Sequence, residues 1–304
     1  MCRISLLVLA CISALAGTAI AACTSSKYEE GSLEHLRCVD VTLNTVVNYG
    51  QLSDIGDITV FQSRIENIPE RSFTRYGRSL VSLNMQDCGI RTISDYAFDG
   101  LTGLKKLSLP YNNITLLRDQ WFASLPSLEQ LDLSHNLITS IEPTAFERLR
   151  GLRRLDVRQN RLTCLEPVQL MPMAGLEKFR FSDNPLSFRC RGTLTLWLHD
   201  LGVDYKSEQR GDEDWLDSLL WLCAADDGKV ADSEVLLKEC VIFNLFNQLR
   251  SGLTTAESYP LAIPQDCVHA RKELTKCVAA GRSVTNGHVV RKLLRQLKES
   301  KSAT

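Results

Sequence analysis

Residues 128–149 read LEQLDLSHNLITSIEPTAFERL, and this stretch decides the fold. Apolar side chains stand at its positions 1, 4, 6, 11, 14, 19 and 22, and Asn136 stands at position 9. The pattern occurs six times in the chain, beginning at Ile55, Leu80, Leu104, Leu128, Leu152 and Leu176. The first interval is 25 residues and every later interval is 24. A fixed period of this size predicts one supersecondary unit stacked on the next.

Each copy predicts a short strand, because alternating apolar residues at positions 4 and 6 turn one face inward. Stacked copies then share a parallel sheet and a continuous core. Position 9 predicts a buried ladder whose side chains bond main-chain groups of the turns, formed by Ser63, Cys88, Asn112, Asn136, Asn160 and Asn184. In this ladder Cys88 is expected to be a buried, unreactive thiol. Position 19 predicts a stacked column on the convex side, formed by Phe73, Phe98, Phe122 and Phe146.

This pattern resembles the leucine-rich-repeat family, in the extracellular type with cysteine-rich caps. The resemblance implies an α/β repeat solenoid, a curved horseshoe with a parallel concave sheet, disulfide caps and a helical carboxyl-terminal region. It divides the chain into a signal peptide (1–22), an amino-terminal cap (23–54), six repeats (55–187), a cysteine-containing carboxyl-terminal cap (188–241) and a helical tail (242–304).

The first 22 residues predict export from the cell. Arg3 precedes an uncharged apolar run, and small residues from Ala19 to Ala22 suit a signal peptidase. Two alternatives are a retained membrane anchor and a bacterial lipoprotein cleavage box that would lipidate Cys23. No other stretch is long enough to cross a bilayer. We therefore expect a secreted, extracellular protein without a transmembrane segment.

Nine of the 11 cysteines follow the signal segment, and export makes disulfides the expected chemistry. No Cys-x-x-Cys pair is present, so we expect neither a zinc site nor any other metal or cofactor. The family resemblance implies a Cys23–Cys38 bridge. In the second cap Phe188 stands where the family has a cysteine, with Cys164 one repeat below it. We therefore expect the pairs Cys190–Cys240 and Cys164–Cys223, and the other pairings stay open.

The concave face is the expected ligand site, because side chains at positions 3, 5, 7 and 8 point outward from the sheet. The candidate residues are Phe61, Gln86, Tyr111, Asp132, His135, Arg154, Asp156, Arg158, Lys178 and Arg180. The face should run from uncharged with exposed aromatics to strongly basic, and aromatics and arginines are common binding anchors. A protein ligand or a glycoconjugate is the expected partner. The alternative is a merely solvated sheet face.

Four further features concern modification and assembly. Asn113-Ile114-Thr115 is a glycosylation sequon, and Arg210-Gly211-Asp212 matches the integrin-binding tripeptide or is a polar turn. An amphipathic helix at 289–299 either folds back on the cap or docks a partner. On one straight helix Cys267 and Cys277 would lie too far apart to pair, so either a turn separates them or they bond elsewhere, and one of them is a candidate intermolecular disulfide. Through the amphipathic helix or one of these cysteines, the chain could form a helix-mediated or disulfide-linked dimer.

The sequence argues against catalysis and against nucleic acid. The five histidines are scattered, and no nucleophile elbow, HExxH motif or phosphate loop is present. A net charge of -1 provides no global attraction for nucleic acid. We therefore expect an extracellular recognition protein, similar to the leucine-rich immune proteins of insects and acting in innate immunity. The alternatives are a cell-adhesion or matrix-associated protein and an enzyme inhibitor of the repeat class.

Overall fold

The computed structural model describes residues 22–27, 33–50, 54–206, 212–226 and 228–244. The expected signal segment before Ala22 therefore lies outside the described residues. So do Arg210, Gly211, Cys267 and Cys277, together with the helices expected beyond residue 244.

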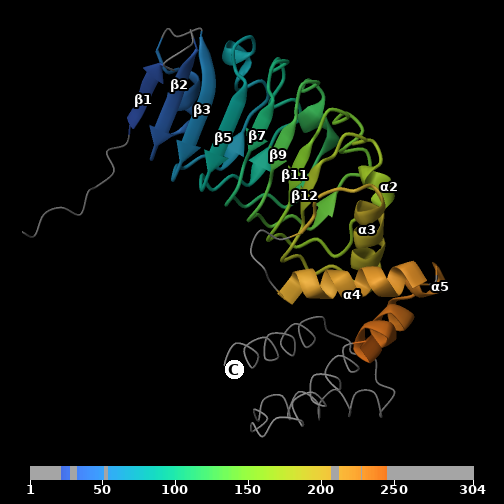
Figure 1. The fold of residues 1–304 in the computed structure, drawn as a ribbon. Coiled ribbons are helices and arrows are strands. Elements are labelled where there is room, and N and C mark those ends of the chain that lie inside the picture. Colours follow the sequence, from blue (N-terminus) through green and yellow to red (C-terminus); the bar gives the residue numbers. More distant parts are fainter. Residues whose placement is uncertain (1–21, 28–32, 51–53, 207–211, 227, 245–304) are drawn as a thin grey trace, which may run out of the picture.

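Eight strands form one curved sheet that follows the order β1-β2-β3-β5-β7-β9-β11-β12 among the described residues (Figure 1). The first pair is antiparallel and every later pair is parallel. The strands are β1 (Ala22–Lys27), β2 (Glu34–Val39), β3 (Ile55–Phe61), β5 (Ser82–Gln86), β7 (Lys106–Ser108), β9 (Gln130–Asp132), β11 (Arg154–Asp156) and β12 (Lys178–Arg180). Each of the six repeats thus contributes one strand, which confirms the predicted solenoid.

The core lies between this sheet and the outer turns of the repeats. Side chains at positions 4 and 6 point into it, so that Leu131 and Leu133 are almost fully buried. The column Phe73, Phe98, Phe122 and Phe146 is buried as predicted. Short elements lie on the outer side of the core, opposite the sheet. They are β4 (Asn67–Ile68), η1 (Thr74–Tyr76), β6 (Thr92–Ile93), β8 (Leu116–Leu117), η2 (Asp119–Phe122), β10 (Ser140–Ile141) and α2 (Pro167–Leu170). Among them β4 pairs with β6 and β8 pairs with β10, both in parallel.

The position-9 ladder is confirmed and ties each repeat to the one before it. Asn136 accepts a bond from the Ile114 main-chain N–H at 3.1 Å and donates to three carbonyls. Cys88 keeps the same place with its sulfur 3.3 Å from the Gln86 carbonyl, and it is free and buried. Burial raises the pKa of the Cys88 thiol to about 12. The ladder therefore satisfies main-chain groups that the repeat turns would otherwise bury without partners.

The amino-terminal cap extends the repeat sheet. Strands β1 and β2 form an antiparallel pair in which Cys23 faces Cys38, and the predicted Cys23–Cys38 bridge is present. Strand β2 then pairs in parallel with β3, so that it acts as an additional strand of the repeat array. Helix α1 (Leu43–Val47) follows and buries Val46.

The carboxyl-terminal cap is helical. It comprises α3 (Phe188–Asp200), α4 (Asp212–Asp226), α5 (Gly228–Ala231) and further helical residues to 244. Trp197 of α3 packs against the repeat core. A second core joins α3 to α4, and in it Phe188 packs with leucines such as Leu216 and Leu220. A buried ion pair between Arg191 and Asp217 links the same two helices.

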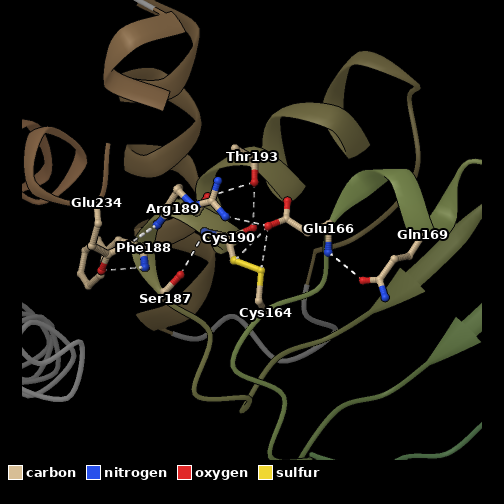
Figure 2. The surroundings of a disulfide bond; sticks show 9 residues. All are labelled: Cys164, Glu166, Gln169, Ser187, Phe188, Arg189, Cys190, Thr193 and Glu234. Carbon is tan, nitrogen blue, oxygen red and sulfur yellow. Dashed lines mark hydrogen bonds and ion pairs between the residues drawn. A yellow bond between two sulfur atoms is a disulfide. The ribbon is translucent and has the colours of Figure 1, made fainter. Parts of the chain in front are cut away.

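The predicted pairing of the other four cap cysteines was wrong. The bridges are Cys164–Cys190 and Cys223–Cys240, with Cα–Cα distances of 5.2 Å and 5.9 Å, in place of Cys164–Cys223 and Cys190–Cys240. The prediction placed Cys164 beneath residue 188. Phe188 turns its side chain into the helical core, however, and the first turn of α3 sets Cys190 over Cys164 (Figure 2).

The surroundings of the Cys164–Cys190 bridge fix the start of α3. Ser187 caps the helix by accepting a bond from the Cys190 main-chain N–H at 3.2 Å. The Glu234 carboxylate accepts from the main-chain N–H groups of Phe188 and Arg189 (Figure 2). A carboxylate is stabilised at this end of a helix, because the free N–H groups there carry partial positive charge. The last repeat and the helical cap are therefore joined by a covalent bond and by capping interactions.

No helix within the described ranges is both long enough and apolar enough to cross a membrane.

Candidate ligand-binding surface

The concave surface is formed by the outward-facing side chains of the parallel strands. Positions 3, 5 and 7 alternate with the buried positions 4 and 6, as strand geometry requires. Position 8 differs, because its residue adopts a left-handed backbone conformation in all six repeats, with φ between 49° and 58°. These residues are Gln62, Asp87, Tyr111, His135, Gln159 and Asp183. The turn after each strand therefore presents the position-8 side chain at one edge of the sheet.

A hollow lies at the amino-terminal end of the concave surface. We call it the amino-terminal pocket, and it is lined by His35, Arg37, Thr59, Phe61, Gln62, Gln86 and Asp87. The Arg37 guanidinium lies 4.5 Å from the centre of the Phe61 ring. His35 Nε2 lies 3.1 Å from Thr59 Oγ1. The predicted anchor Phe61 is therefore partly covered by Arg37.

An aromatic platform lies in the middle repeats. The rings of Tyr111 and His135, from neighbouring position-8 turns, stack with centroids 3.9 Å apart and planes 15° apart. Tyr111 is 49% exposed, so the platform offers an aromatic face to solvent. Such a face can contact an apolar or planar group of a ligand.

A second hollow, the carboxyl-terminal groove, crosses strands β7, β9, β11 and β12. Its lining residues are Lys106, Leu107, Gln130, Leu131, Asp132, Arg154, Leu155, Asp156, Arg158, Lys178 and Arg180. Five of these side chains are cationic and two are anionic. The groove therefore has a local excess of positive charge, although the whole chain carries a net charge of -1.

Two of the arginines in this groove are held by carboxylates. Arg158 donates from Nε and Nη2 to Asp156, at 3.0 Å and 2.7 Å to the same oxygen. Arg180 has a side chain only 5% exposed, and its Nη2 donates to Asp204 at 2.7 Å. The hydrogen bond from Arg180 lowers the pKa of the Asp204 carboxyl below its usual value. The predicted strongly basic end is thus a mixture of paired arginines and other cations.

Asp204 reaches the groove because the chain returns to the sheet after α3. Lys178 and Asp204 form an isolated parallel bridge, and the Phe179 main-chain N–H donates to the Asp204 carbonyl at 2.9 Å. The Arg180 Nε atom is buried and has no acceptor within the described ranges.

The candidate residues that the sequence indicated all lie on the concave strands or their turns. Phe61 and Gln86 line the amino-terminal pocket, Tyr111 and His135 form the platform, and the others line the groove. The polar lining residues outside that candidate list are His35, Arg37, Thr59, Gln62, Asp87, Lys106 and Gln130. Lys106 and Gln130 occupy position 3, so the repeat register could have found them. His35 and Arg37 could have been found only by recognising β2 as a concave strand.

Two further sites concern the expected glycosylation and the expected absence of a metal. Asn113 of the glycosylation sequon is exposed, as expected for an acceptor. Atoms of Cys164, Glu166 and Cys190 cluster in a way that could suit a metal ion. The two sulfurs are bonded to each other, however, and metal binding by cysteine requires thiolates.

The repeat register places Asp132, His135 and Asp156 on neighbouring strands and turns of the concave face. Asp132 accepts bonds from the Ser134 main chain and hydroxyl, and Asp156 holds Arg158. His135 stacks on Tyr111. The described contacts of these three side chains are therefore hydrogen bonds, an ion pair and ring stacking, as in ordinary structural or surface residues.

The sequence model of the leucine rich repeat family matches residues 78–138 and 131–186. Repeats of this family are typically non-catalytic. No curated protein matches the sequence. One similar solved structure is a crystal structure of a TLR13-ssRNA13 complex; it is 20% identical, with a TM-score of 0.44, and the match covers 58% of this chain and 29% of that one. The chain therefore spans less than a third of that protein's length.

The parallel strands are stacked, the position-9 ladder links the repeats, and disulfide bridges lie at both ends of the array. Together with the family match, these features identify this chain as a leucine-rich-repeat protein with disulfides.

Proposed function

We propose that this chain is a secreted recognition protein that binds an extracellular protein or glycoconjugate through its concave surface. The observation that carries the proposal is the concave surface itself, where a pocket, an aromatic platform and a charged groove occupy one continuous sheet. A rigid sheet that presents many side chains on one face can bind a large ligand with little cost in conformational entropy.

Secretion is part of the proposal. The apolar segment with small residues at 19–22 supports it, and so do three disulfides in the described residues, because such bonds persist in oxidising compartments. Mass spectrometry of the exported protein should find its first residue at Cys23. An amino-terminus at Met1 on a cell-associated protein would contradict the proposal.

Affinity purification from extracellular fluid tests the binding function. The bait is the full mature chain, and the concave variant is Tyr111→Asn with Arg154→Gln. Asparagine tolerates the left-handed backbone at position 111, so the fold should survive. The control is Met171→Gln with Arg150→Gln, at exposed sites outside the concave strands. Proteins or glycans captured by the wild type and control but lost with the concave variant support the proposal. Equal capture by all three baits contradicts it.

Innate immunity is the proposed setting, supported by the resemblance to the leucine-rich immune proteins of insects. Binding of the purified protein to whole microbes or their surface glycans would support this role. Capture of matrix or adhesion proteins alone would favour the adhesion role instead. The proposed intermolecular disulfide through Cys267 or Cys277 predicts a dimer-sized band on a gel without reductant, and a single monomer band there would refute it.

A further inference from the structure

A line of polar and charged side chains crosses the carboxyl-terminal groove. Strand pairing places Lys106, Gln130, Arg154 and Lys178, all at position 3, in register on four adjacent strands. We call this line the position-3 column. Neighbouring strands lie about 4.8 Å apart, so the column runs for roughly 14 Å across the sheet.

The neighbouring position 2 shows what is unusual about this column. There Lys105 pairs with Glu129 at 3.4 Å, and Arg153 pairs with Glu177, each across one repeat boundary. At position 3, one residue further along the chain, Lys106 and Arg154 are exposed and form no ion pair with any described residue. The repeats therefore supply acidic partners to the cations at position 2 and none to these two at position 3.

The acidic side chains of the groove do not compensate the column. Asp156 is engaged by the Arg158 guanidinium. Asp132 Oδ1 accepts from the Ser134 hydroxyl at 2.7 Å, and Asp132 Oδ2 accepts from the Ser108 hydroxyl at 3.3 Å. Asp132 keeps its negative charge, but five cations against two carboxylates leave an excess of cationic donors for a ligand that enters the groove.

The lining of the groove restricts the class of ligand. Among the described residues no aromatic side chain lines it, whereas proteins that bind single-stranded nucleic acid stack bases on aromatics. A protein partner would be anchored by large apolar side chains in a pocket, but the only apolar lining residues in the described part of the chain are the buried Leu107, Leu131 and Leu155. What the groove offers is cations spaced along a line, which suits a linear polymer with regularly spaced negative groups.

We propose that the position-3 column binds a sulfated polysaccharide that lies across strands β7, β9, β11 and β12. Sulfate groups would accept bonds from Lys106, Arg154 and Lys178, and sugar hydroxyls would meet Gln130 between them. This proposal rests on the proposed function of the concave surface and names the ligand class for one part of it.

The test is binding of the full mature protein to heparin, a sulfated polysaccharide, at several salt concentrations. The column variant is Lys106→Gln with Arg154→Gln. The control is Lys105→Gln with Arg153→Gln, which removes the same two residue types from the adjacent positions. Both variants change the net charge equally, and the control breaks only exposed ion pairs, which contribute little to stability.

We expect wild-type binding to weaken as salt rises, because screening acts on exposed charges. The column variant should bind heparin about tenfold or more weakly, and the control should stay within about twofold of the wild type. Equal losses in the two variants would overturn the proposal, because they would show attraction to net charge alone. Absence of heparin binding by the wild type at low salt would overturn it as well.

Two other probes of the groove are single-stranded polyuridylate and polyglutamate, compared with heparin at equal charge concentration. Tighter binding of either probe would overturn the polysaccharide assignment. Failure with heparin, combined with concave-dependent capture of an extracellular protein, would leave the proposed function standing and remove only this inference. Failure of both assays would count against the concave surface as a binding site.

Discussion

Replacing the ladder asparagines by alanine should destabilise the fold by amounts that follow from their hydrogen bonds. Asn112 Oδ1 accepts from two buried main-chain donors, the N–H groups of Cys88 at 3.0 Å and Ile90 at 3.1 Å. In the next repeat Asn136 Oδ1 accepts from one, the N–H of Ile114. The two substitutions therefore orphan different numbers of donors within the same structural unit.

The main-chain carbonyls that accept bonds from the ladder are less affected by these substitutions. The Leu109 carbonyl that Asn136 binds also accepts from Asn112, and the Leu133 carbonyl also accepts from Asn160. Removing one asparagine thus leaves each of these carbonyls a second donor. The cost should come mainly from the orphaned N–H groups, at about 1–3 kcal/mol for each.

We therefore predict that Asn112→Ala lowers the free energy of unfolding by about 2–6 kcal/mol and Asn136→Ala by about 1–3 kcal/mol. Glu147→Ala, at an exposed site in the repeat of Asn136, is the control and should stay within about 0.5 kcal/mol of wild type. Urea denaturation with the disulfides intact measures all three proteins. A loss below about 1 kcal/mol for Asn112→Ala, or a larger loss for Asn136→Ala, would refute this account of the ladder.

Three other properties can be predicted. Cys88, whose pKa burial raises to about 12, should resist alkylation at pH 8 in the native protein and react only after denaturation; mass spectrometry that finds native labelling would contradict its placement. Arg191→Met should cost about 3–5 kcal/mol, because it strands the buried Asp217 carboxylate, and adding Asp217→Leu should recover much of that loss in urea melts. Asp204, whose pKa the Arg180 hydrogen bond lowers, contributes stability that is present above about pH 4 and lost as the pH falls through the lowered pKa. Asp204→Asn should remove that component from a pH titration of stability, and an unchanged profile would show that the ion pair contributes nothing.

The repeats could be predicted from sequence because their determinants are local and recur. Apolar positions spaced like those of residues 128–149 identify the strands, and position 9 identifies buried polar residues wherever it falls. The same logic placed the free thiol of Cys88 correctly, since a small side chain there can still meet the Gln86 carbonyl.

The ends of the array were harder, because their contacts depend on how a non-repeating segment folds onto the last repeat. The Cys164–Cys190 bridge depends on the direction of the first turn of α3, which the spacing of cysteines does not reveal. The Arg180–Asp204 pair likewise depends on the chain returning to the sheet at Asp204, after a helix that carries no repeat pattern.

The concave surface was predicted in outline and corrected in detail. Its positions follow from strand alternation, which the repeat register supplies. The burial of Arg180, the stacking of Tyr111 on His135 and the Arg37–Phe61 contact depend on neighbouring side chains from other strands. A net charge of -1 was also a poor guide to the groove, where five of the lining residues are cationic and two are anionic.

Photo-cross-linking in extracellular fluid tests most directly whether the concave surface binds the ligand. A photoreactive phenylalanine analogue is placed at Tyr111, which is 49% exposed on the concave edge, or at Met171, which is 60% exposed just beyond α2. Our account predicts a discrete cross-linked product from position 111 and none from position 171. Cross-linking from position 171 alone would contradict it.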